Sequence, residues 1–152
     1  MQKHSLMKGI VGISFALFAT ANFAATPEGF WKSIDDRTGE QLSIVEIRKG
    51  TDGYYHGKIV YRYSNSHGIK LENCIKCPAP YTNKPILGMD IIKGLKHVDG
   101  TNNYEKGRVI DPLSGKLYDA KMKLNATGKR LSLRAYIGVS ALGRNQTWLR
   151  ID

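Results

Sequence analysis

The last strand-like stretch of the chain reads RNQTWLRI, from Arg144 to Ile151, and its side chains alternate with a period of two. That period is typical of a β-strand rather than a helix. A second such stretch, GFWKS from Gly29 to Ser33, opens the folded part of the chain. If the two stretches pair, Arg150 can lie over the ring of Trp31, where a cation–π contact contributes about 0.5–2 kcal/mol. We therefore predict that Trp31 and Arg150 together close one end of a barrel.

The same alternation recurs between these two ends, and it predicts eight sequential strands with mostly short connections. Such a chain favours an all-β, eight-stranded up-and-down antiparallel barrel, because pairing the first strand with the last removes exposed sheet edges. An open β-sandwich is the alternative architecture. The expected strands are Gly29–Ser33, Leu42–Lys49, Tyr54–Tyr63, Met89–Val98, Tyr104–Ile110, Lys116–Asn125, Leu131–Tyr136 and Arg144–Ile151.

Two connections differ from the short turns. The stretch from Gly138 to Gly143 is long enough to hold one helical turn. The segment from Ser64 to Gly88 is long and polar, and it contains both cysteines. We expect this segment to lie over the mouth of the barrel as a lid.

The first 25 residues have the pattern of a secretory signal peptide. Lys3 and Lys8 precede an apolar run from Ile10 to Ala19, and small residues follow at Ala21, Ala24 and Ala25. The run is too short to span a bilayer, which needs about 20 residues. We therefore predict residues 1–25 as a signal peptide and residues 26–152 as a single β-barrel domain that is periplasmic or secreted and does not span the membrane.

The chain is strongly basic, with a net charge of +10 that falls to +8 when the two lysines of the leader are removed. A basic exterior suits an anionic envelope surface, although frequent lysines also occur on ordinary solvated surfaces. Export removes access to nucleic acid, and no basic-aromatic RNA motif is present. Nucleic acid is therefore not an expected partner.

Several aromatic and basic side chains share strand faces, and these faces predict a ligand site. If they point inward, arginine and glutamine can fix an anionic or carbonyl group while the aromatic rings supply stacking surface. The alternative is that the aromatic side chains fill the core and the arginines point to water. The residues assigned to this site are Tyr61, Tyr118, Arg134, Tyr136, Arg144, Gln146 and Trp148.

Cys74 and Cys77 form a C-x-x-C motif and are the two cysteines of the chain. A disulfide is the main interpretation, because an exported protein meets an oxidising compartment. A metal site that adds two of His56, His67 and His97 is one alternative, although their spacing does not support it. A redox-active dithiol is the other, but the motif lies in a proline-rich loop rather than at a helix N-terminus.

The mature chain also resembles a secreted bacterial family catalogued as domain of unknown function 2147, from about Phe30 to Ile151. The Gly-x-Trp start and the arginine near the end resemble the lipocalin and wider calycin arrangement. The resemblance implies an export signal and a calycin-like barrel, and it implies no settled activity. It is carried in order by Gly57–Val60, Pro85–Gly88, Gly94–Lys96, Gly107–Tyr118, Tyr136–Ser140 and Leu142–Trp148.

The sequence does not favour an enzyme. It has neither a G-x-S-x-G elbow nor an H-E-x-x-H motif. No catalytic residue, metal ligand or cofactor is therefore assigned, and an enzyme acting on lipid or glycan is the least favoured interpretation. The main hypothesis is an exported barrel that binds a small, amphipathic or anionic, lipid-like ligand. The alternative is a cell-envelope interaction module without a ligand cavity.

Overall fold

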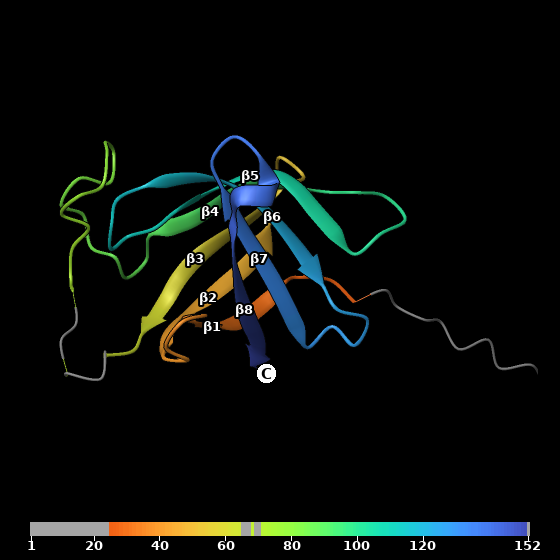
Figure 1. The fold of residues 1–152 in the computed structure, drawn as a ribbon, viewed down its shortest axis with the longest axis horizontal. Coiled ribbons are helices and arrows are strands. Elements are labelled where there is room, and N and C mark those ends of the chain that lie inside the picture. Colours follow the sequence, from red (N-terminus) through yellow and green to blue (C-terminus); the bar gives the residue numbers. More distant parts are fainter. Residues whose placement is uncertain (1–24, 65–67, 69–70, 152) are drawn as a thin grey trace, which may run out of the picture.

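The computed structural model describes residues 25–64, 68 and 71–151, so the signal peptide interpretation lies outside the described residues. Eight antiparallel strands follow one another around a closed barrel, each paired with its neighbour in sequence (Figure 1). The strands are β1 (Gly29–Ile34), β2 (Gln41–Lys49), β3 (Tyr55–Arg62), β4 (Asp90–His97), β5 (Asn103–Ile110), β6 (Leu117–Leu124), β7 (Arg130–Tyr136) and β8 (Arg144–Ile151).

Pairing between β1 and β8 closes the barrel, with Trp31 opposite Arg150 and Ser33 opposite Trp148. The predicted up-and-down barrel is therefore confirmed, and the open sandwich is wrong. One short 3₁₀ turn, η1 (Ser140–Leu142), lies in the β7–β8 connection, where the sequence allowed a helical turn. Within the described residues, no helix is long and apolar enough to cross a membrane.

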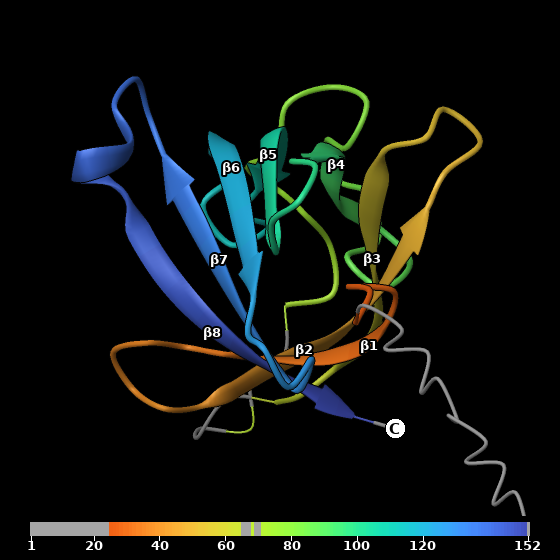
Figure 2. The ribbon, with the colours of Figure 1, turned by 90° about the vertical axis from the view of Figure 1, so that its right-hand side faces the viewer.

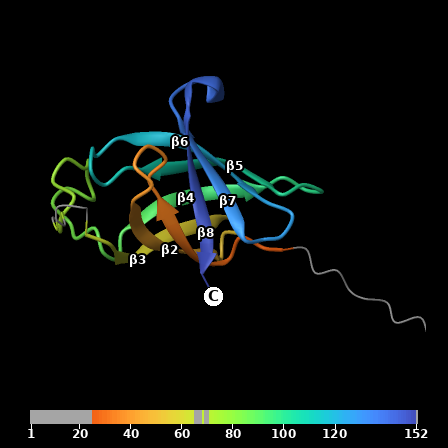
Figure 3. The same cartoon turned by 60° about the horizontal axis from the view of Figure 1, so that its bottom comes forward.

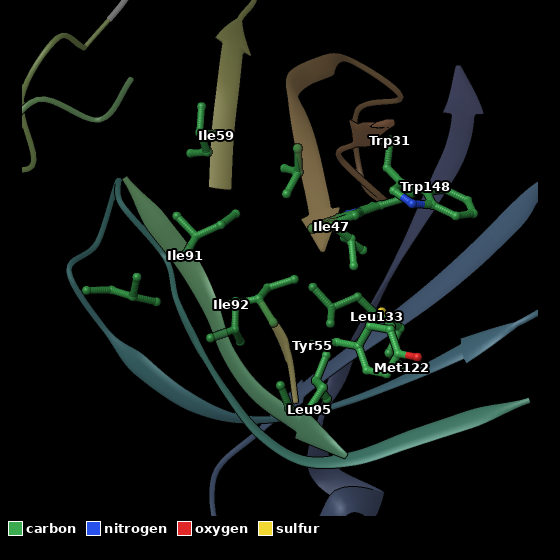
Figure 4. Packing of buried hydrophobic residues seen from close by; sticks show 14 of the residues in the cluster. Trp31, Ile47, Tyr55, Ile59, Ile91, Ile92, Leu95, Met122, Leu133 and Trp148 are labelled. Carbon is green, nitrogen blue, oxygen red and sulfur yellow. The ribbon is translucent and has the colours of Figure 1, made fainter. Parts of the chain in front are cut away.

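Alternation places one face of each strand in a shared core. Trp31 and Trp148 are almost fully buried, and Val45, Met122 and Leu131 pack into the same cluster. Figure 4 shows Trp31 and Trp148 on one side of this cluster, with Tyr55 and Leu95 further along the barrel. Burial of such large apolar side chains is the main stabilising contribution to the fold. The centre of the barrel is therefore filled by side chains.

Arg150 and Trp31 close one end of the barrel, as predicted. The guanidinium carbon lies 4.4 Å from the centroid of the Trp31 ring. Its three nitrogens donate to the carbonyl oxygens of Thr26, Glu28 and Gly128 at 2.5–2.7 Å. The arginine thus ties the N-terminal segment and the β6–β7 turn to the ends of β1 and β8.

The segment from Leu71 to Gly88 lies at the opposite end, where the lid was expected. Figures 1 and 3 show it on the left, while the β4–β5 turn lies at the far right. The segment forms a small hairpin, in which Asn73 bridges to Pro85. Within the segment, the side chain of Ile86 is fully buried. The segment therefore covers part of the mouth and contributes to the core.

A disulfide joins Cys74 to Cys77, which confirms the main interpretation of the motif. Both cysteines are buried in the core cluster, and Cys74 Sγ lies 3.1 Å from the carbonyl oxygen of Pro112. The disulfide therefore closes a local turn of the hairpin, and this turn packs against the β5–β6 turn. Among the described residues no group of three His, Cys, Asp or Glu side chains is placed to hold a metal ion, and His67 lies outside them.

Two carboxylates in turns, Asp35 and Asp52, make the free energy of unfolding depend on pH in the acid range. Backbone N–H groups of Arg37 and Thr38 donate to Asp35, and this lowers the pKa of Asp35 below its ordinary value of 3.8. The backbone N–H of Tyr54 and the ring of His56 lower the pKa of Asp52 in the same direction. A carboxyl whose pKa is lower in the folded state stabilises the fold above the unfolded pKa. That contribution is lost as pH falls through the folded value.

We therefore expect Asp35→Asn to be less stable than the parent at neutral pH, with the difference closing as pH falls below about 3.8. Urea unfolding of both proteins across the acid range measures that difference. Glu105→Gln, an exposed carboxylate on β5, is the control and should show no comparable closing difference. A difference between parent and Asp35→Asn that stays constant through the acid range contradicts the assignment.

Candidate functional site

The candidate site is the layer of inward-facing side chains at the mouth of the barrel, beneath the 71–88 segment. Cross-strand pairs join its polar members along one wall. Ser33 on β1 lies opposite Ser43 on β2, and Ser43 lies opposite Arg62 on β3. On the other side, Ser33 lies opposite Trp148 on β8, and Gln146 precedes it on the same face. Four neighbouring strands therefore supply a continuous polar row.

The two serines are the buried polar side chains of the described core, with 3% and 7% of their surface exposed. Their hydroxyl oxygens lie 2.8 Å apart, and the Ser43 N–H donates to the Ser33 hydroxyl at 3.2 Å. Next to them the Trp148 indole N–H donates to the Gln146 side-chain oxygen at 3.1 Å. These contacts satisfy buried polar groups that otherwise reduce stability by about 1–3 kcal/mol each.

Arg62 is the charged member of this row. Its side chain is half-buried and donates a hydrogen bond to the carbonyl of Leu71 at the start of the covering segment. Burial lowers the pKa of Arg62, and the nearby carboxylate of Glu72 opposes that change. The guanidinium remains charged because its ordinary pKa is so high. A positive charge therefore lies inside the mouth, between the barrel wall and the segment.

The opposite wall of the mouth is more apolar. Tyr118 on β6 faces inward opposite Val109 and packs against the core. Ala135 on β7 lies opposite Arg144 on β8, at the rim. The Arg144 guanidinium donates to Asp36 at 3.1 Å, so the β1–β2 turn holds it at the edge of the mouth. The mouth thus combines a charged polar wall with an aromatic and aliphatic wall.

Of the seven residues predicted for the ligand site, four share the inner face near the mouth: Tyr118, Arg144, Gln146 and Trp148. Their role in binding stays a prediction. The expected inward orientation of Tyr61, Arg134 and Tyr136 is wrong, for two different physical reasons.

Tyr61 points outward because β3 contains a β-bulge. Val45 pairs with Ile59, while its neighbour Ile44 pairs with Tyr61, so Val60 is an extra residue. A bulge changes which residues of a strand face the core. Tyr61 is half exposed as a result, and the next residue, Arg62, faces inward in its place. Sequence reasoning missed Arg62, and the adjacent apolar pair Ile59–Val60 is the signal that could have revealed it.

Arg134 and Tyr136 point outward because the aliphatic face of β7 takes the core. Leu131 and Leu133 are buried, which places Ser132 and the two predicted residues on the outside. Arg134 then braces the β7–β8 connection instead of lining the mouth. Its guanidinium donates to the carbonyls of Ser140 and Ala141 at 2.6 and 3.1 Å.

A hollow of about 280 Å³ on the outside of β2–β4 contains a His–Asp pair. His56 Nε2 lies 3.0 Å from Asp52, and His56 Nδ1 accepts from the Gly94 N–H at 3.4 Å. Because Nδ1 accepts a hydrogen bond, the ring N–H is at Nε2, and it donates a hydrogen bond to the Asp52 carboxylate. Both ring nitrogens are therefore engaged in hydrogen bonds. The pair fixes the β2–β3 turn against β4.

Comparisons with known proteins agree with the barrel fold. Residues 29–150 match the profile of a family described as "Uncharacterized protein conserved in bacteria (DUF2147)". Among solved structures, the chain resembles protein HP1028 from Helicobacter pylori, which is described as a member of the lipocalin family. The TM-score is 0.70 at 20% identity, over 84% of each chain, a likeness that shows the fold. No curated protein matches the chain.

Proposed function

This chain belongs to the bacterial family DUF2147, and from its lipocalin-like barrel we propose that it binds one small amphipathic molecule with an acidic head group at the mouth. The observation that carries the proposal is the inward-facing Arg62, half-buried beside the buried serine pair. Barrels of eight strands have an interior just wide enough for side chains or one small ligand.

The packing of the barrel limits where such a ligand can lie. Trp31 and Trp148 are almost fully buried inside the barrel, so we place the head group in the outer layer, against Arg62 and Gln146. The apolar tail then lies along Tyr118 and the underside of the 71–88 segment. Hydrogen bonds to a charged group contribute about 1.5–3 kcal/mol, which makes the arginine the main determinant of affinity.

Export remains part of the proposal, with residues 1–25 as the signal peptide and the periplasm or the exterior as the place of action. The disulfide and the likeness to a lipocalin-family protein support it. Lipid-like molecules with carboxylate or phosphate groups are present in such an envelope, and a small soluble barrel is suited to carrying one. No enzymatic step is proposed.

The direct test is native mass spectrometry of protein purified after expression and export of the full chain, followed by titration with dansyl-labelled undecanoic acid. We expect a co-purifying acidic amphiphile and saturable binding of the probe. Arg62→Met should weaken probe binding about tenfold or more. The matched control is Arg108→Met, because Arg108 is an exposed outward arginine on β5.

A second matched pair tests the assignment of faces. Tyr118→Leu should weaken probe binding, whereas Tyr61→Leu should leave it unchanged, because Tyr61 points outward from the bulge in β3. Circular dichroism and thermal unfolding establish that each variant is folded. Equal probe affinities for the parent, Arg62→Met and Tyr118→Leu would rule out the mouth as the binding site.

A further inference from the structure

The β7–β8 connection exposes an unusual amount of aliphatic surface. Ile137, Val139 and Leu142 are 68%, 58% and 81% exposed, and η1 contains no buried residue. Figures 2 and 3 show η1 at the periphery of the barrel, at the end of β7 and the start of β8. Single exposed aliphatic residues are common on protein surfaces. Several on one short loop indicate a site of contact with a membrane or another protein.

Hydrogen bonds and two glycines fix the conformation of this loop, with its aliphatic side chains exposed. Arg134 donates to two carbonyls of the η1 turn and, at 2.9 Å, to the Asn145 side chain. Gly138 has a positive φ of 74°, and a Cβ on Gly143 would lie 2.6 Å from the Ala135 carbonyl oxygen. The loop therefore has a defined shape, and its aliphatic side chains are not there to pack against the barrel.

The outer face of β6–β7 is mostly basic: Lys121, Lys123, Arg130 and Arg134 point outward, and Asp119, paired with Arg108, is the acidic residue among them. From Ala120 to Ile151 the chain contains seven lysines and arginines and no aspartate or glutamate. Lys121 on β6 lies directly opposite Arg134 on β7, a pairing of like charges that does not favour the sheet. Lys123, Lys129 and Arg130 are exposed further along the same strands, toward the β6–β7 turn at their other end. A basic face beside an aliphatic loop complements an anionic, apolar partner.

We propose that this loop and the outer face of β6–β7 dock the protein on an anionic lipid bilayer. Ile137, Val139 and Leu142 enter the acyl boundary, and the basic side chains lie against acidic head groups. The arrangement is that of an interfacial anchor, in which buried apolar area and attraction to anionic lipids act together. The proposal does not depend on ligand binding at the mouth.

Vesicle flotation of the full chain tests the proposal, with phosphatidylglycerol–phosphatidylethanolamine vesicles compared with phosphatidylcholine vesicles. The leader is common to every variant, so differences between variants report the loop. We expect Ile137→Ser/Val139→Ser/Leu142→Ser to lower partition onto the anionic vesicles about tenfold or more. Its control, Tyr54→Ser/Val98→Ser, replaces exposed apolar residues on the β2–β3 and β4–β5 turns at the closed end of the barrel and should bind as the parent does.

The charged face is tested separately. Lys121→Gln/Lys123→Gln should lower partition by about fivefold for each lysine, an effect that disappears at high salt. Lys58→Gln/Lys96→Gln is the control, because these lysines lie opposite Glu46 and Glu105. The proposal is overturned if the loop variant retains parental partition or if the parent binds phosphatidylcholine equally well. It is also overturned if the loop variant changes only self-association, which identifies a second copy as the occupant.

Discussion

Replacing Arg150 with methionine is expected to lower the free energy of unfolding by about 3 kcal/mol, because one side chain holds the closed end together. The guanidinium stacks 4.4 Å from the centre of the Trp31 ring and donates to three backbone carbonyls. Each charge-assisted hydrogen bond contributes about 1.5–3 kcal/mol in a protein. Methionine keeps part of the apolar contact, and the released carbonyls can bind water, so the loss is smaller than the sum.

Urea unfolding, followed by tryptophan fluorescence, measures this loss because Trp31 and Trp148 are both buried in the core. Arg130→Met is the matched control. Arg130 lies opposite Leu149 on the neighbouring strand and is exposed, so its replacement should change stability by less than about 0.5 kcal/mol. Equal stabilities of Arg150→Met and the parent would show that the closed end does not depend on the arginine.

Closure could be predicted because both partners lie in strongly patterned end strands. The structure also explains why a glycine stands two residues before Trp31. Gly29 has a φ of 126°, and a Cβ there would lie 2.8 Å from Arg150 Nη1. The carbonyls that receive the guanidinium could not be predicted, because their place depends on how residues 26–28 and the β6–β7 turn cross the barrel end.

The mouth was harder to predict because polar and apolar alternation gives two faces without saying which one is inside. On β6 the choice was correct, since Lys121 and Lys123 face outward and Met122 is buried. On β7 the alternating Leu131 and Leu133 indicate the buried face, because apolar burial is the stronger driving force. The prediction instead placed Arg134 inside to meet a ligand. On β3 a single extra residue reversed the faces at the mouth, and register of that kind is set by pairing rather than by composition.

The glycine of the β5–β6 turn shows how the covering segment is held at the mouth. Gly115 has a φ of 72°, and its N–H donates to the Asp111 carbonyl at 2.8 Å. Its α-carbon packs directly against the Lys76 carbonyl in the covering segment, so that a Cβ there would overlap that carbonyl. The contact lies beside Cys74, whose sulfur touches Pro112 in the same turn.

Gly115→Ala is therefore expected to displace the 71–88 segment from the barrel and to lower the free energy of unfolding by about 3 kcal/mol. A left-handed backbone accounts for only about 1–2 kcal/mol of this. Gly39→Ala separates the two causes, because Gly39 has nearly the same φ, 73°, but nothing within 4 Å of its added Cβ. The control should lose only the backbone contribution.

Limited trypsin digestion measures the displacement directly, since Lys76 is exposed and lies within the disulfide-closed turn. Cleavage after Lys76, detected by mass spectrometry after reduction, should be about tenfold or more faster in Gly115→Ala than in the parent or in Gly39→Ala. If both alanine variants are cleaved at one rate, the close contact between the β5–β6 turn and Lys76 does not hold the segment in place. The buried side chains of Cys74, Cys77 and Ile86 then remain as the contacts that do.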